Sequence, residues 1–138
     1  MGLAEVFESA VDTVFTVFVD AVKVGRYVIP PVDSGWGGTE TSVKHEMSVI
    51  VNGLSQEDKK NTSFYTQIQP NDTIIMVKGI DIRDNSIRVS NSDLFEIDFT
   101  SYTDLFTIEA HDTDPVEALF IILLREKQRN IIEPEIEP

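Results

Sequence analysis

The chain contains two histidines, and one of them stands beside carboxylates. In the sequence His111-Asp112-Thr113-Asp114 an imidazole precedes two aspartates, and side chains of these types are competent metal ligands. One histidine beside turn aspartates is nevertheless more typical of a solvated turn, and the Asp-rich loop with a distal Glu that binds calcium is missing. His45 alternates with apolar residues, which is typical of a core or interface histidine. We therefore predict no metal site.

The patterns that carry nucleophilic or phosphoryl chemistry are also missing from the sequence. There is no cysteine, which excludes a thiolate nucleophile, a thiolate metal site and a disulfide framework together. No Gly-x-Ser-x-Gly elbow, His-Glu-x-x-His or P-loop is present. The 24 Asp and Glu residues are too abundant for any one pair to be singled out as catalytic. We predict that the protein is not an enzyme and needs no cofactor.

The charge is strongly acidic, with 24 Asp and Glu against 11 Lys and Arg and a formal net charge of -13. No cation lies between Arg88 and Arg125, although many acids do. Because clustered cations drive phosphate binding, a tight direct grip on nucleic acid is disfavoured. Two interpretations stay open: an ordinary solvated acidic surface, or a surface that must repel DNA, such as the wall of a conduit.

The elements that would position these groups begin with an N-terminal helix. From Leu3 to Val22 the apolar residues recur at helical spacing, which predicts an amphipathic helix over residues 3–24, and Gly25 is placed to stop it. The many β-branched residues in 13–19 leave a strand as the alternative there. The apolar stripe of this helix packs on the protein's own sheet or docks on a neighbouring subunit.

Two segments are predicted to be loops. Residues 30–42 contain two prolines and three glycines around Trp36, and an aromatic residue in such a setting either anchors a partner or pins the loop to its own domain. Residues 52–63 form a polar connection that is too long for a tight hairpin. Loops of this length are often functional or disordered.

Short apolar runs separated by turn residues predict an antiparallel sheet. Val43–Asn52 alternates as a half-buried strand does, and so does Leu94–Phe99. Phe64–Ile68 and Thr73–Val77 are split by Gln69-Pro70-Asn71-Asp72, a tight-turn sequence, so the two runs are predicted to form a hairpin. Further pieces of the sheet are expected at Ile80–Arg83, Ile87–Val89 and Asp104–Ala110.

Residues 116–125 carry conflicting signals. Asp114, Pro115 and Glu117 fit the N-cap, N1 and N3 positions of a helix. Leu119–Leu124, however, is a short continuous apolar run, which is typical of a strand buried on both faces. Local signals alone favour the helix slightly. The run is far too short to cross a bilayer, and the N-terminus lacks the basic region of a signal peptide.

These features predict one domain over residues 1–128, of the α+β class and mainly β. It consists of the N-terminal amphipathic helix, the loop at 30–42 and a small antiparallel β-barrel or meander over residues 43–125. Residues 129–138 end in alternating acids, isoleucines and prolines. They are predicted to form a flexible, extended acidic tail that is disordered or lies on a partner.

This order of features resembles the head-completion, or head–tail joining, proteins of the neck of tailed bacteriophages. The resemblance is carried by the helical stretch Phe7–Tyr27, by Ile68–Gly79 and by the closing run Leu119–Arg125. Ile68–Gly79 is similar to the family's "(R/P)-x-G-D-x-(L/I)-x-(I/V)-x-G" hairpin, with Asn71 where Gly is usual. The longer segment between Gly79 and Leu94 and the acidic tail depart from the family pattern.

The resemblance implies a structural virion protein, assembled in the host cytoplasm, with residues 116–125 as a strand. Such a protein forms a homo-oligomeric ring under the portal, closes the DNA-filled capsid and docks the tail. The implied partners are the portal or adaptor ring and the tail terminator or tail-tube proteins. Double-stranded DNA would pass through the ring without tight binding, and no membrane would take part.

Two sets of residues are candidates for these roles. Partner docking is expected at apolar residues of the helix, the loop and the tail, namely Phe7, Phe15, Phe18, Trp36, Ile131, Ile132 and Ile136. Acidic residues are expected to face the channel, namely Glu57, Asp58, Asp93, Glu96 and Asp98.

Other functions fit the same sequence. Within virion assembly, the alternative is a tail terminator or tail-tube ring protein. From other classes come an acidic DNA-mimic inhibitor and a small regulatory or small-molecule binding module. A DNA mimic would bind a DNA-binding enzyme with strong salt dependence, and a binding module would show a closed apolar pocket.

Overall fold

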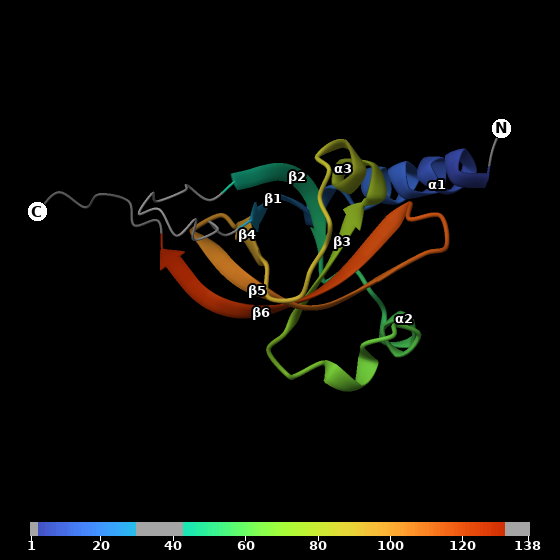
Figure 1. Ribbon diagram of the computed structural model, residues 1–138. Coiled ribbons are helices and arrows are strands. Elements are labelled where there is room, and N and C mark those ends of the chain that lie inside the picture. Colours follow the sequence, from blue (N-terminus) through green and yellow to red (C-terminus); the bar gives the residue numbers. More distant parts are fainter. Residues whose placement is uncertain (1–2, 30–42, 132–138) are drawn as a thin grey trace, which may run out of the picture.

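Six strands form a closed antiparallel barrel in the order β1-β2-β3-β6-β5-β4. The computed structural model describes residues 3–29 and 43–131, and the side chains of residues 8–29 and 43–130 (Figure 1). The strands are β1 (Val22–Ile29), β2 (Val43–Val51), β3 (Thr73–Lys78), β4 (Leu94–Asp98), β5 (Tyr102–Thr113) and β6 (Leu119–Ile131). The predicted mainly β fold, with an antiparallel barrel and an N-terminal helix, is thus confirmed in its outline.

The main core fills the barrel. Alternation along each strand sends one set of side chains inward, as in β4, where Phe95 and Ile97 are fully buried and Glu96 faces outward. On β3 both faces are buried. The reason is that α1 (Leu3–Val17) covers part of the outside of the barrel, where Phe15 packs with Ile50 and Met76.

The N-terminal helix is shorter than the sequence predicts. It ends at Val17 instead of residue 24, and a 3-10 turn, η1 (Val19–Ala21), leads directly into β1. The β-branched residues at the end of the predicted helix signalled this weakness. Gly25 does not stop a helix. It lies within β1, where an added Cβ would stand 2.5 Å from a ring carbon of Phe95.

The predicted hairpin between residues 64–68 and 73–77 does not form. β3 pairs with β2 on one side and β6 on the other, so neither edge is left for residues 64–68. Phe64 instead packs as a buried side chain with Ile74 and Leu123, and the next residues form a 3-10 turn, η2 (Tyr65–Gln67). Within the predicted loop 52–63 lies a short helix, α2 (Gln56–Lys60).

The chain after β3 is helical where a strand was predicted. Ile80–Arg83 belongs to α3 (Gly79–Asp84), and Ile87 and Val89 pack on the barrel core without joining the sheet. Gly79 permits this turn because it lies against the backbone of Glu117, whose carbonyl oxygen would be 1.7 Å from an added Cβ. No larger residue fits there without moving one of the two segments.

Residues 119–131 form a strand, as the resemblance implies, and the helix that the local signals favoured is absent. The Asp114 carboxylate accepts hydrogen bonds from the backbone N–H groups of Val116 and Leu119, at 3.1 and 2.8 Å. It therefore stabilises a turn instead of starting a helix. β6 runs to Ile131, so residues 129–131 belong to the sheet and not to the predicted tail. Residues 132–138 lie outside the described part of the chain.

Among the described residues, no helix has both the length and the apolar character needed to cross a membrane.

Candidate docking surface

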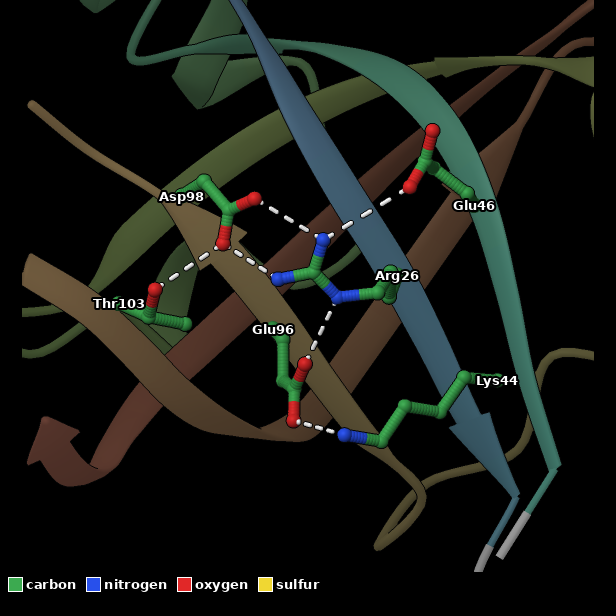
Figure 2. Close-up of polar contacts among 6 residues, drawn as sticks. All are labelled: Arg26, Lys44, Glu46, Glu96, Asp98 and Thr103. Carbon is green, nitrogen blue, oxygen red and sulfur yellow. Dashed lines mark hydrogen bonds and ion pairs between the residues drawn. The ribbon is translucent and has the colours of Figure 1, made fainter.

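The predicted channel-facing acids Glu96 and Asp98 belong to an ion-pair cluster centred on Arg26 (Figure 2). The Arg26 guanidinium donates to Glu96 from Nε at 2.8 Å and to Asp98 from Nη1 at 2.9 Å. Lys44 Nζ donates to the other oxygen of Glu96 at 2.8 Å. Arg26 Nη1 also lies 3.8 Å from Glu46.

Strand register brings this cluster together. Arg26 on β1 is the direct cross-strand partner of Glu96 on β4 and of Glu46 on β2, so these three side chains point to the same outer face of the barrel. The hydrogen bond from Arg26 lowers the pKa of Asp98. Burial raises the pKa of Glu96, but the hydrogen bonds from Arg26 and Lys44 outweigh that effect and lower it.

The cluster gives Glu96 and Asp98 cationic partners. Two cations, Arg26 and Lys44, compensate most of the charge of the carboxylates around them, so these two acids do not present an uncompensated negative surface. Asp93 is also engaged, because the hydroxyl of Tyr27 donates to its carboxylate at 2.5 Å. Burial raises the pKa of that hydroxyl.

Glu57 and Asp58 are exposed, but they do not join the other three acids. Both lie on α2, which is on a different side of the barrel from β4 (Figure 1). The five predicted channel residues are therefore not brought together into one acidic surface.

The candidate docking residues also separate. Phe15 is only 6% exposed and packs in the core between α1 and the sheet, so it offers almost no surface to a partner. Phe18 is 44% exposed, so its ring is accessible to a partner. Phe7 belongs to α1 and Ile131 ends β6, but their side chains lie outside the described set. Trp36, Ile132 and Ile136 lie outside the described residues.

Phe18 is the middle residue of an exposed apolar patch, and it is the only residue of this patch among the predicted docking residues. Its neighbours Val17 and Val19 are 70% and 65% exposed. The patch, defined as Val17, Phe18 and Val19, lies where α1 ends and the chain turns into η1, held by the Phe18 N–H to Val14 carbonyl hydrogen bond of 3.0 Å. Three consecutive large apolar residues cannot all face inward from one helix, and this signal could have identified Val17 and Val19.

A shallow groove begins beside the patch. Its first part, of about 680 Å³, is lined by residues of α1, η1, β1, β2 and β3: Asp12, Phe15, Thr16, Val19, Val22, Ser48 and Lys78. A second part, of about 350 Å³, shares Ser48 and Lys78 and continues along β2 to α3, past Val24, Glu46, Met47 and Asp81. The two parts form one path, called here the β2 groove.

Ion pairs hold the wall of the β2 groove in place. Lys78 Nζ lies 3.1 Å from the Asp12 carboxylate and 5.0 Å from the centre of the Phe15 ring. Arg83 of α3 pairs with Glu8 of α1 and donates to the Glu117 carbonyl at 3.0 Å. These contacts join α1 to β3 and to α3 beside the patch and the groove.

The two histidines do not assemble a metal site in the described part of the chain. His111 is exposed and His45 is half-buried. Within the described residues, no group of three or more His, Cys, Asp or Glu side chains is placed to hold a metal ion.

No protein-family model matches the chain, and no curated protein is significantly similar to it.

Proposed function

We propose that the protein is a structural subunit of a bacteriophage head-to-tail connector that acts by docking and not by catalysis. In this role it forms a ring under the portal of the virion, helps to close the DNA-filled capsid and receives the tail. The proposal combines the sequence resemblance with the barrel-plus-helix architecture, which is of the kind that the resemblance implies.

One observation carries the docking role: the consecutive residues Val17, Phe18 and Val19 are all exposed where α1 ends, and Val19 lines the β2 groove. Large apolar side chains exposed in a contiguous patch are typical of interaction sites, and an aromatic residue at the centre is a common anchor. The acidic net charge of -13 suits a ring through which DNA must slide without binding.

The experiment compares the full chain alone with the chain mixed with portal and tail-completion proteins of tailed bacteriophages. Native mass spectrometry measures the size of the assemblies, and electron microscopy shows whether a ring lies under the portal. We expect rings only when the portal is present. A chain that binds none of these proteins at micromolar concentration would contradict the proposal.

A matched pair of variants tests the patch. Phe18 and Tyr65 are 44% and 43% exposed, but Tyr65 belongs to η2, away from the patch. Phe18→Ser is expected to weaken portal binding by about tenfold or more, whereas Tyr65→Ser is expected to leave it unchanged. Equal effects of the two substitutions would show that the patch is not the docking site.

The same experiment separates the alternatives. A tail terminator or tail-tube protein would form rings with tail proteins and not with the portal. A DNA mimic would bind a DNA-processing enzyme instead, with an affinity that falls steeply as salt is added. A small regulatory module would remain a monomer with all of these partners.

A further inference from the structure

The edge of β2 is only partly paired. β2 pairs with β1 over Val43–Ile50, but β3 pairs with β2 only at Val49–Val51. The reason is that β3 ends at Lys78 and the chain turns away into α3. The backbone of Val43–Ser48 therefore has no strand partner on its outer edge within the described residues. This edge borders the β2 groove, which contains Glu46, Met47 and Ser48.

A second partly paired edge, on β6, is protected against strand addition. Beyond Leu124 this strand pairs only with β5, but the register shift between Leu105 and Phe106 leaves Lys127 as a bulge. The run Arg125–Arg129 is also highly charged. Bulges and charges are the usual means by which an edge strand is protected from pairing.

The edge of β2 lacks these protections. Its pairing with β1 is regular and has no bulge. Its charged side chains face the ion-pair cluster on the outer surface, where Lys44 binds Glu96 and Glu46 approaches Arg26. An unpaired strand edge beside apolar side chains is the geometry that accepts an extended peptide as an additional strand.

The lining of the β2 groove indicates the chemistry of that peptide. Apolar contacts are offered by Val19, Val22 and Val24, of which Val24 is 43% exposed. The charged residues are one cation, Lys78, which is paired with Asp12, and two further acids: Glu46, which lies 3.8 Å from Arg26, and Asp81. A cationic peptide side chain would therefore meet an excess of negative charge.

Of the acids that line the groove, Asp81 is the one without a paired cation among the described residues. It is half-buried, and it makes no ion pair with another described residue. Burial raises the pKa of its carboxyl, and the nearby Asp84 and Asp12 act in the same direction against Lys78. A lysine or arginine brought into the groove would relieve this unfavourable environment.

We propose that the outer edge of β2, at Val43–Ser48, accepts as an added strand an extended segment of a partner protein in which apolar residues alternate with lysine or arginine. A second copy of this chain is a poor occupant, because its strands are paired in its own barrel and the segments before β2 and after β6, residues 30–42 and 132–138, contain no lysine or arginine. The inference rests on the proposed function only in that both require a partner protein.

The test uses the full chain and a library of decapeptides in which valine alternates with positions randomised among lysine, glutamate and serine. We expect selected peptides to be enriched in lysine over glutamate by about tenfold or more. A peptide from the enriched pool should slow amide hydrogen exchange within Lys44–Ser48. Equal recovery of lysine and glutamate, or protection confined to another strand, would overturn the proposal.

Variants link the binding to the groove. Asp81→Asn is expected to weaken the binding of the lysine peptide roughly two- to fivefold. The control Asp58→Asn removes an exposed acid from the third position of α2, as Asp81 occupies the third position of α3, and should change nothing. Equal affinity of both variants for the peptide would contradict the assignment of the cation to Asp81.

The outcome is independent of the ring. If the chain fails to assemble with a portal but still binds the lysine peptide on β2, the proposed function fails and the strand-addition site stands. If concentration-dependent self-association of the chain alone protects the amides of Lys44–Ser48, the occupant is a second copy and the proposal of a basic partner is wrong.

Discussion

Arg26 and Glu96 are direct cross-strand partners on β1 and β4, and Arg26 Nε lies 2.8 Å from the Glu96 carboxylate. The Arg26 side chain is 21% exposed and that of Glu96 17%, so the pair is largely shielded from water. Arg26 also forms a two-pronged contact with Asp98. Because one guanidinium bonds both carboxylates, this residue connects β1 to β4 through side chains as well as through the backbone.

We expect Arg26→Met to lower the free energy of unfolding by about 2–3 kcal/mol, because Asp98 would lose the guanidinium that pairs with it and Glu96 would keep only Lys44. Urea denaturation followed by circular dichroism measures this change. Arg88→Met is the control, since Arg88 is exposed and its side chain makes no ion pair with the described residues. An equal loss for both variants would show that the cluster does not stabilise the barrel.

The same cluster predicts a loss of stability in acid. The pKa values of Glu96 and Asp98 lie below their ordinary values of 4.5 and 3.8, so the folded protein binds fewer protons at these groups than the unfolded chain does. The two ionised carboxylates therefore stabilise the folded state at pH values above their ordinary pKa values. This stabilisation is lost as the pH falls through their lowered pKa values. Urea midpoints measured as the pH is lowered should fall less steeply for Arg26→Met than for the unmodified chain.

The parts of the fold that the sequence predicted well are those with strict alternation. Val43–Val51 and Leu94–Asp98 each place apolar residues at every second position, and both are strands. β1 was missed because its first residues also continue the helical spacing of α1. A local pattern could not decide between the two, and the pairing of Val22–Ile29 with β2 did.

The failed hairpin has a different cause. Phe64–Ile68 contains good strand formers, but a strand can form only where a neighbour has a free edge, and both edges of β3 are taken by β2 and β6. Likewise, Arg26 and Glu96 are 70 residues apart, so their contact depends on a register that one sequence does not contain. The sequence placed Phe15 and Phe18 on the same apolar stripe, and only the packing of α1 on the sheet separates the buried Phe15 from the exposed Phe18.

Gly79 is expected to tolerate no side chain. An added Cβ would lie 1.7 Å from the Glu117 carbonyl oxygen, a backbone atom that cannot move alone. At Gly53 the nearest atoms, both at 2.7 Å, are the Cγ2 methyl of Ile50 and the terminal methyl of Met76, which are side-chain atoms and can shift with less disturbance than a backbone carbonyl. We expect Gly79→Ala to cost about 3 kcal/mol or more and Gly53→Ala about 1 kcal/mol. Thermal unfolding of the two variants should show this order, and the reverse order would refute the close contact of α3 with residue 117.

Two phenylalanines three residues apart should behave in opposite ways in the isolated chain. Phe15 is 6% exposed and packs against the sheet, so Phe15→Ala should lower the free energy of unfolding by about 3 kcal/mol. Phe18 is 44% exposed, so Phe18→Ala should change it by less than about 0.5 kcal/mol. Urea titration of both variants measures this difference. A large loss for Phe18→Ala would mean that the patch is needed for folding and is not kept exposed for a partner.

Asp81 is expected to make the isolated chain slightly less stable at neutral pH. Burial raises the pKa of its carboxyl, so the folded state disfavours the ionised form, and stability falls as the pH rises from the ordinary value of 3.8 through the raised one. Asp81→Asn removes that penalty and should raise the free energy of unfolding at pH 7 by roughly 0.5 kcal/mol. Asp58→Asn, at the same helical position of α2, controls for the lost attraction between an acid and a helix N-terminus. If Asp81→Asn is no more stable than Asp58→Asn in urea, the groove does not disfavour the ionised carboxylate of Asp81, and this prediction is wrong. An acid that weakens its own fold while strengthening the binding of a cationic strand is the trade-off expected of a binding site.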